Sequence, residues 1–101
     1  MKTFNDLKEG DYIYELDTFS GNVDCLKVSK ILPFFSSDNI IIRFDKNTSI
    51  RFRTDESFKS VFGVFYFCNQ KDCLDKLSKL TKHYQTVLKR AKQNIQKLKE
   101  L

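Results

Sequence analysis

The C-terminal third of the chain, residues 69–101, contains neither Gly nor Pro, so nothing in it interrupts a helix. Asn69 is a favourable N-cap residue, and Asp72 follows three residues later, near the positive end of the helix dipole. Apolar residues then recur at heptad positions a, d and e, a stripe wider than the seam of a two-stranded coiled coil. The pattern predicts one long amphipathic helix, which the rest of the fold must accommodate.

This helix is too long for the remainder of the chain to cover. About 32 residues extend ~48 Å, whereas a compact unit of the remaining residues is roughly 28 Å across. Leu74, Leu77 and Leu80 are expected to cover that unit, which leaves about 20 Å of apolar stripe beyond it. Either the helix bends back, or another chain covers the stripe. The residues of this expected partner or oligomer interface are Tyr84, Val87, Leu88, Ala91, Ile95, Leu98 and Leu101.

The first two thirds of the chain have the short alternating patterns of β-strands. Strands are expected at residues 12–17, 23–32, 40–44, 50–53 and 64–67, with an irregular segment at 54–63. In the second strand, Leu26 and Val28 point inward, the pattern slips at residues 29–31 as in a β-bulge, and Pro33 ends the strand. The predicted fold is α+β: a small antiparallel SH3-like β-barrel or curled sheet of about five strands at 1–68, followed by the helix at 69–101, together forming a single domain.

Positive charge is concentrated in the helix. Residues 1–67 carry nine Lys and Arg against ten Asp and Glu, whereas residues 68–101 carry nine against three, so the net charge of +5 comes entirely from the second segment. The longest apolar runs are far shorter than a membrane span, and the first residues have no apolar signal region. We therefore expect a cytoplasmic protein that does not interact with membranes.

A second basic surface is predicted on the hairpin of residues 40–53. If Phe44 pairs with Ile50, then Arg43 lies opposite Arg51, and both share an outward face with Arg53. Arginines grouped in this way suit phosphate groups. Together with Lys82, Lys89 and Arg90 of the helix, they form a candidate anion or nucleic-acid site. Alternatively, Glu15, Asp17 or Asp55 neutralises the arginines within the protein.

No residue pattern indicates catalysis, a metal site or a cofactor. His83 is the only His, and the chain has no Gly-rich phosphate loop and no set of four zinc ligands. Cys25, Cys68 and Cys73 are expected to be reduced thiols, buried or half-buried. The ten Phe are expected to form most of the core, apart from Phe34 and Phe35 in a loop after Pro33.

Two short segments resemble known small barrels. Residues 7–14, LKEGDYIY, followed by residues 27–31, KVSKI, resemble the opening strands of KOW-like and Src-homology-3-like domains. The opening KTFNDLKEGDYIY and the junction from Phe65 to Leu77 also resemble small uncharacterised proteins of bacteriophages and mobile elements of gut bacteria. The resemblance implies an accessory, adaptor or inhibitor protein that acts in the host cytoplasm.

Taken together, these features favour a non-catalytic protein-binding module. The expected partner is another protein or a second copy of the chain, bound through the helix stripe. The alternative is a small barrel that binds nucleic acid without sequence specificity through its arginines and the basic helix.

Overall fold

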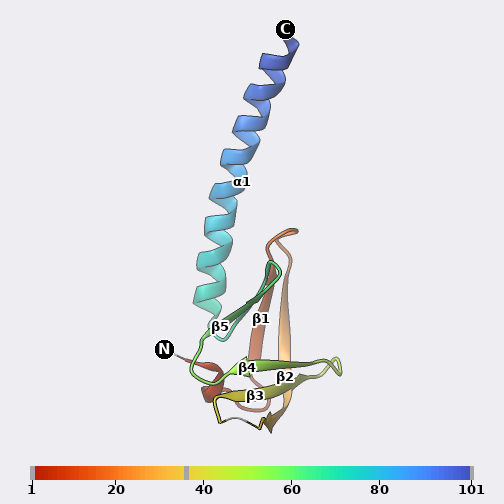
Figure 1. The fold of residues 1–101 in the computed structure, drawn as a ribbon, viewed down its shortest axis with the longest axis vertical. Coiled ribbons are helices and arrows are strands. Elements are labelled where there is room, and N and C mark those ends of the chain that lie inside the picture. Colours follow the sequence, from red (N-terminus) through yellow and green to blue (C-terminus); the bar gives the residue numbers. More distant parts are fainter. Residues whose placement is uncertain (1, 36, 101) are drawn as a thin grey trace.

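The five predicted strands and one that was not predicted pair into one nearly closed antiparallel sheet of six strands, and a single long helix follows it (Figure 1). The computed structural model describes residues 2–35 and 37–100. The fold is therefore the predicted α+β small barrel with a C-terminal helix. Its elements are η1 (Phe4–Asp6), β1 (Tyr12–Asp17), β2 (Val23–Pro33), β3 (Asn39–Phe44), β4 (Ser49–Arg53), β5 (Phe58–Val61), β6 (Val64–Phe67) and α1 (Gln70–Lys99).

The strand order is β4-β3-β2-β1-β6-β5, so β4 and β5 are the two end strands. Lys59 of β5 connects these ends, because its ammonium group donates a 2.5 Å hydrogen bond to the Arg51 carbonyl of β4 and lies 5.6 Å from the Phe52 ring. Partial burial lowers the pKa of Lys59. A side chain, rather than a row of backbone hydrogen bonds, brings the two end strands together.

β5 lies in the segment that we expected to be irregular, so that expectation was wrong. β5 and β6 are joined by a two-residue turn, Phe62-Gly63, in which both residues have positive φ (49° and 83°). This is the geometry of a type I′ hairpin turn, which usually carries Asn-Gly. A Phe at the first position does not predict this turn, because a bulky residue rarely adopts positive φ.

The long strand β2 bends as predicted. Leu26 and Val28 are buried, Lys27 is exposed, and the pairing of β2 with β3 shifts register between Val28 and Lys30. Pro33 is the last residue of β2 and lies opposite Ile40. The bulge lets one strand belong to both halves of the sheet and so curls the sheet toward closure.

The protein has two hydrophobic cores. The first lies inside the barrel, where Phe4 stacks on Phe52 with ring centroids 4.2 Å apart. The second lies between α1 and the outer face of β1 and β6, and its centre is Leu16, Phe67 and Cys73. The buried residues of the first core are Phe4, Leu7, Ile13, Leu26, Val28, Ile42, Phe44, Phe52 and Cys68.

The expectation that most Phe are buried was only partly correct. Phe4, Phe44, Phe52 and Phe67 are core residues, and Phe35 is exposed as predicted. Three others, namely Phe19, Phe58 and Phe62, are also exposed. A barrel this small has room inside for only a few large rings, so the remaining rings lie on its surface.

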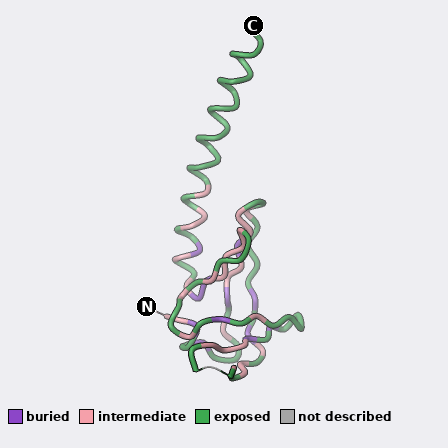
Figure 2. Tube along the Cα trace, in the orientation of Figure 1, coloured by how far each residue is buried: buried purple, intermediate pink, exposed green. Residues whose placement is uncertain are grey.

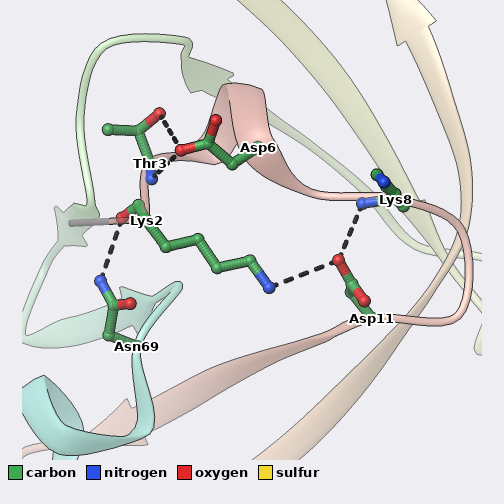
Figure 3. A network of polar contacts seen from close by, with 6 residues as sticks. All are labelled: Lys2, Thr3, Asp6, Lys8, Asp11 and Asn69. Atoms are coloured by element: carbon green, nitrogen blue, oxygen red, sulfur yellow. Dashed lines mark hydrogen bonds and ion pairs between the residues drawn. The ribbon is translucent and has the colours of Figure 1, made fainter.

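A polar network ties the start of the helix to the N-terminal segment (Figure 3). The Asn69 amide donates a 3.0 Å hydrogen bond to the Lys2 carbonyl instead of capping the helix. The Lys2 ammonium lies 3.4 Å from the Asp11 carboxylate, which also accepts the Lys8 amide at 2.9 Å. These contacts lower the pKa of Asp11, chiefly through the Lys8 hydrogen bond. The first turn of α1 is thereby held against the lead-in to β1.

The three cysteines lie in different environments. Cys68 and Cys73 are buried, but Cys25 is exposed, so the expectation of burial was wrong for Cys25. Burial raises the pKa of Cys68 to about 12 and also raises the pKa of Cys73. No helix among the described residues is long and apolar enough to span a membrane.

These environments predict the thiol chemistry of the folded protein. At neutral pH we expect a disulfide reagent to modify Cys25 quickly and to modify Cys68 and Cys73 only after unfolding, since the thiolate is the reactive species. A spectrophotometric thiol count in buffer and in denaturant measures this. The Cys25→Ser variant is the control, and rapid native modification of that variant would contradict the burial of Cys68 in the first core or of Cys73 in the second.

Candidate protein-binding surface

The helix contacts the barrel through one face of its first half. Cys73, Leu77 and Leu80 pack against Leu16 and Phe67 in the second core. The Lys76 ammonium also lies over the Phe65 ring, 4.6 Å from its centroid. Leu74, which we expected to cover the barrel, is 55% exposed, because the turn of the helix places it at the edge of this face.

The contact ends at Tyr84. The Tyr84 hydroxyl donates a hydrogen bond to the Thr18 carbonyl in the loop between β1 and β2. From Thr81 to Glu100 every residue is classed as exposed, and the last turns of α1 extend into open space (Figures 1 and 2). The molecule measures 62 × 25 × 23 Å, and its radius of gyration is 18.0 Å, whereas a compact chain of this length has about 13 Å. Residues 85–100 are called the overhang below.

The apolar face continues along the overhang. Each helical residue advances by roughly 100°, so Val87, Leu88, Ala91, Ile95 and Leu98 lie within an arc of about 100° that also contains Cys73, Leu77 and Leu80. These five overhang residues are called the overhang stripe. Leu88 and Leu98 are 60% and 68% exposed. Leu101, the last residue of the predicted interface, lies outside the described residues.

The stripe therefore divides into a packed half and an unpacked half on one continuous helix. Of the two expected ways to cover it, bending back is not observed, since α1 runs without interruption from Gln70 to Lys99. An exposed apolar face of this kind is a candidate interface.

The loop between β1 and β2 contacts the helix where it leaves the barrel, and the tip of the β5–β6 hairpin contacts that loop. The backbone amide and hydroxyl of Thr18 donate to the Gly63 carbonyl, at 3.0 Å and 2.6 Å, and Tyr84 bonds to Thr18. The Phe19 ring packs on Gly63 so closely that a Cβ there would lie 2.5 Å from a ring carbon. Phe19 and Phe62 are nevertheless 81% and 94% exposed. Sequence reasoning assigned these two rings to the core. For Phe19 the available signal was its position in a loop before Gly21 and Asn22, whereas nothing in the local sequence indicated the turn at Phe62.

The predicted pairing of arginines was wrong. Arg43 lies opposite Ser49, and Arg51 lies opposite Ile41, a shift of two residues from the expected register. A tight turn sets this register, because the Phe44 amide donates to the Thr48 carbonyl at 2.9 Å and Asn47 adopts a φ of 60°. The alternation of the strands still leaves all three arginines on one face of the hairpin.

Neighbouring side chains form ion pairs or ring contacts with two of these arginines. Arg53 forms ion pairs with Asp55 at 3.3 Å and Glu56 at 3.6 Å, and the Asp55 contact raises the pKa of Arg53. Internal neutralisation is therefore found for Arg53 through Asp55. The Arg51 guanidinium lies over the Phe34 ring, 5.3 Å from its centroid.

The other two proposed neutralising carboxylates have different partners. Asp17 accepts the backbone amide of Phe19 at 2.8 Å, and Glu15 hydrogen-bonds to Tyr66. That hydrogen bond and, above all, burial raise the pKa of Tyr66 to about 12. Of the three carboxylates that were expected as alternatives, Asp55 is therefore the one that pairs with an arginine.

The structure does not bring the two basic sets together. The arginines belong to β3 and β4, at the end of the molecule away from the C-terminus (Figure 1). Lys82, Lys89 and Arg90 lie on α1, and the overhang that holds the last two extends in the opposite direction. The residues of the candidate nucleic-acid site thus form two separate surfaces.

One cavity lies beside the helix docking site. Phe65 stacks on both Phe58 and Phe67, with the three ring centroids 5.8–6.4 Å apart. The three rings line a cavity of about 280 Å³ together with charged side chains of α1. Within the described residues, no group of three or more His, Cys, Asp or Glu could hold a metal ion. The cavity is too small and open to define a ligand.

Comparisons with known proteins identify no relative. The chain matches no protein family, no curated protein and no solved structure. Conclusions about function therefore depend on the geometry described above.

The division of the stripe predicts how truncation affects stability. A chain that ends at Val87 keeps every described contact between α1 and the barrel, so we expect its free energy of unfolding to lie within about 0.5 kcal/mol of the full chain. A chain that ends at Asn69 loses the buried Cys73 and the half-buried Leu77 and Leu80, and each half-buried Leu contributes about 1–2 kcal/mol. Urea denaturation followed by fluorescence of the tyrosines measures both. Equal midpoints for the two truncated chains would contradict the second core.

Proposed function

We propose that this protein is a non-catalytic protein-binding module that engages a protein partner, or a second copy of itself, through the overhang stripe. The supporting observation is that the face of α1 that builds the second core continues, exposed, beyond the barrel. A role as an accessory or inhibitor protein of a phage or mobile element, in the host cytoplasm, belongs to this proposal and rests only on the resemblance of the sequence.

The energy available from the stripe is modest. Completing the burial of four half-exposed side chains contributes about 1 kcal/mol each, and a partner of similar chemistry contributes a similar amount. Association costs at least about 4 kcal/mol in lost translational and rotational freedom. The stripe alone therefore supports weak binding, so contacts beside it determine the affinity.

The overhang also needs a partner for its own stability. The described hydrogen bonds of residues 85–100 all stay within the helix, for example from the Thr86 hydroxyl to the Lys82 carbonyl and from the Gln96 amide to Glu100. Most of the stability of a helix in a protein comes from packing against other elements, which this segment lacks. The packed segment of residues 73–84 is stabilised by the second core instead. Binding and helix ordering are thus coupled in the overhang.

Hydrogen exchange measured by NMR tests the proposed function. In a dilute monomer we expect the amides of residues 87–99 to exchange rapidly and those of residues 73–84 to be protected, because only the latter segment is packed. Raising the concentration, or adding a partner, should protect the overhang. Leu88→Glu should abolish that protection, while Gln93→Glu, which adds the same charge on the opposite face, should not.

One result would contradict the proposal. If light scattering shows a monomer at about 100 µM whose overhang is already as well protected as residues 73–84, the helix needs no partner. The stripe would then have no role in binding.

The alternative proposal is non-specific binding of nucleic acid, and the net charge of +6 on residues 68–101 favours it. Since the two basic sets are separate, we expect any such binding to depend on the helix lysines and not on Arg43 or Arg51. Substituting Lys82, Lys89 and Arg90 by Gln should lower the salt slope by about two to three units. If DNA and RNA are not retained at about 50 mM salt, this alternative is eliminated.

A further inference from the structure

The charges beside the overhang stripe are all of one sign. Arg90 and Lys97 border it on one side, and Lys92 and Lys99 border it on the other. Residues 81–100 contain one acidic residue, Glu100, which lies at the C-cap. Any helix that lies along the stripe therefore meets a basic row on each side.

A second copy of the chain is a poor occupant for this surface. Pairing two overhangs places basic rows beside basic rows, and like charges at the edges of a helix pair oppose association. The acidic residues Asp72 and Asp75 of α1 cannot compensate, because the apolar face of their segment is already packed on the barrel. Nucleic acid would match the charges but would leave the apolar stripe in water.

The hairpin tips add a second observation. Phe62 is 94% exposed and has a φ of 49° at the first position of a type I′ turn, where Asn is the favourable residue. An exposed ring and a sparsely populated backbone conformation are both unfavourable for an isolated barrel. The tip is connected to Tyr84, the last packed residue of α1, by the contacts Tyr84–Thr18 and Thr18–Gly63. Phe62 thus belongs to the hairpin that is bonded to the loop at which the overhang begins.

We infer that the overhang stripe is the docking surface for an amphipathic helix of a different protein, whose apolar stripe is bordered by Asp and Glu, and that Phe62 contacts the end of this helix. The inference rests on the proposed function and names the chemistry of its partner. The partner's carboxylates pair with Arg90, Lys92, Lys97 and Lys99, and its apolar side chains cover Leu88, Ile95 and their neighbours.

Three synthetic peptides of equal length test the inference by fluorescence polarisation with the full chain. One has Leu at positions a, d and e with Glu at the flanking positions; the second has the same Leu positions with Lys at the flanks; the third has the composition of the first in an order that forms no stripe. We expect the first peptide to bind at least about tenfold more tightly than either of the others. Arg90→Glu combined with Lys97→Glu should weaken binding of the first peptide by a similar factor.

Matched variants separate docking from general charge attraction. Leu88→Glu should weaken binding of the first peptide about tenfold or more, while Gln93→Glu, with the same change of charge, should have little effect. Phe62→Asn should weaken binding several-fold, although Asn favours the turn and so preserves the barrel. If the Phe62→Asn variant binds the first peptide as tightly as the unchanged protein does, the hairpin tip is not part of the docking surface.

Three outcomes overturn the inference, and they separate it from the proposed function. Equal binding of the first and third peptides would mean attraction by charge alone. Binding of none of the peptides, together with self-association that Leu88→Glu abolishes, would make a second copy the occupant and leave the proposed function standing. Binding of none, without self-association and with a protected overhang in the monomer, would overturn both.

Discussion

The packing of Cys73, Leu77 and Leu80 on Leu16 and Phe67 is the contact on which the shape of this protein depends. It joins a helix of 30 residues, about 45 Å long, to a barrel that packs only on the first half of that helix. The helix is straight and anchored at its first turns, so its second half must extend past the barrel. The exposed stripe is thus a direct consequence of where the helix is attached.

The direction of the helix is set at two points. At its start, the Asn69 side chain bonds to the Lys2 carbonyl, and four turns later the Tyr84 hydroxyl bonds to the Thr18 carbonyl. Between these points the second core fills the space under the helix. The packed half therefore acts as a fixed base, and the overhang is presented away from the barrel together with the hairpin tips that carry Phe19 and Phe62 (Figure 1).

Charge has different consequences in the two halves of the molecule. On the hairpin of β3 and β4, Arg53 forms ion pairs with Asp55 and Glu56, and the Arg51 guanidinium lies over the Phe34 ring. Both arginines therefore already interact with neighbouring side chains. On the overhang, four basic residues border an apolar face, namely Arg90, Lys92, Lys97 and Lys99, and Glu100 is the one acidic residue in that part of the sequence. This combination is the reason to expect selectivity for a partner with acidic borders, since like charges beside a stripe exclude similar helices.

Much of the architecture could be predicted from local pattern. The run of residues 69–101 without Gly or Pro predicted the helix and its apolar face, and the alternation around Leu26 and Val28 predicted a bent strand with its bulge. These features depend on neighbours in the chain, so the sequence alone determined them. Three others depended on contacts between distant segments. The turn at Thr48 set the register that separates Arg43 from Arg51, the barrel's small interior left Phe62 outside, and the anchoring of Asn69 and Tyr84 decided which half of the stripe is buried. The sequence pattern specifies which face of the helix is apolar, but only the tertiary structure specifies how much of that face the barrel covers.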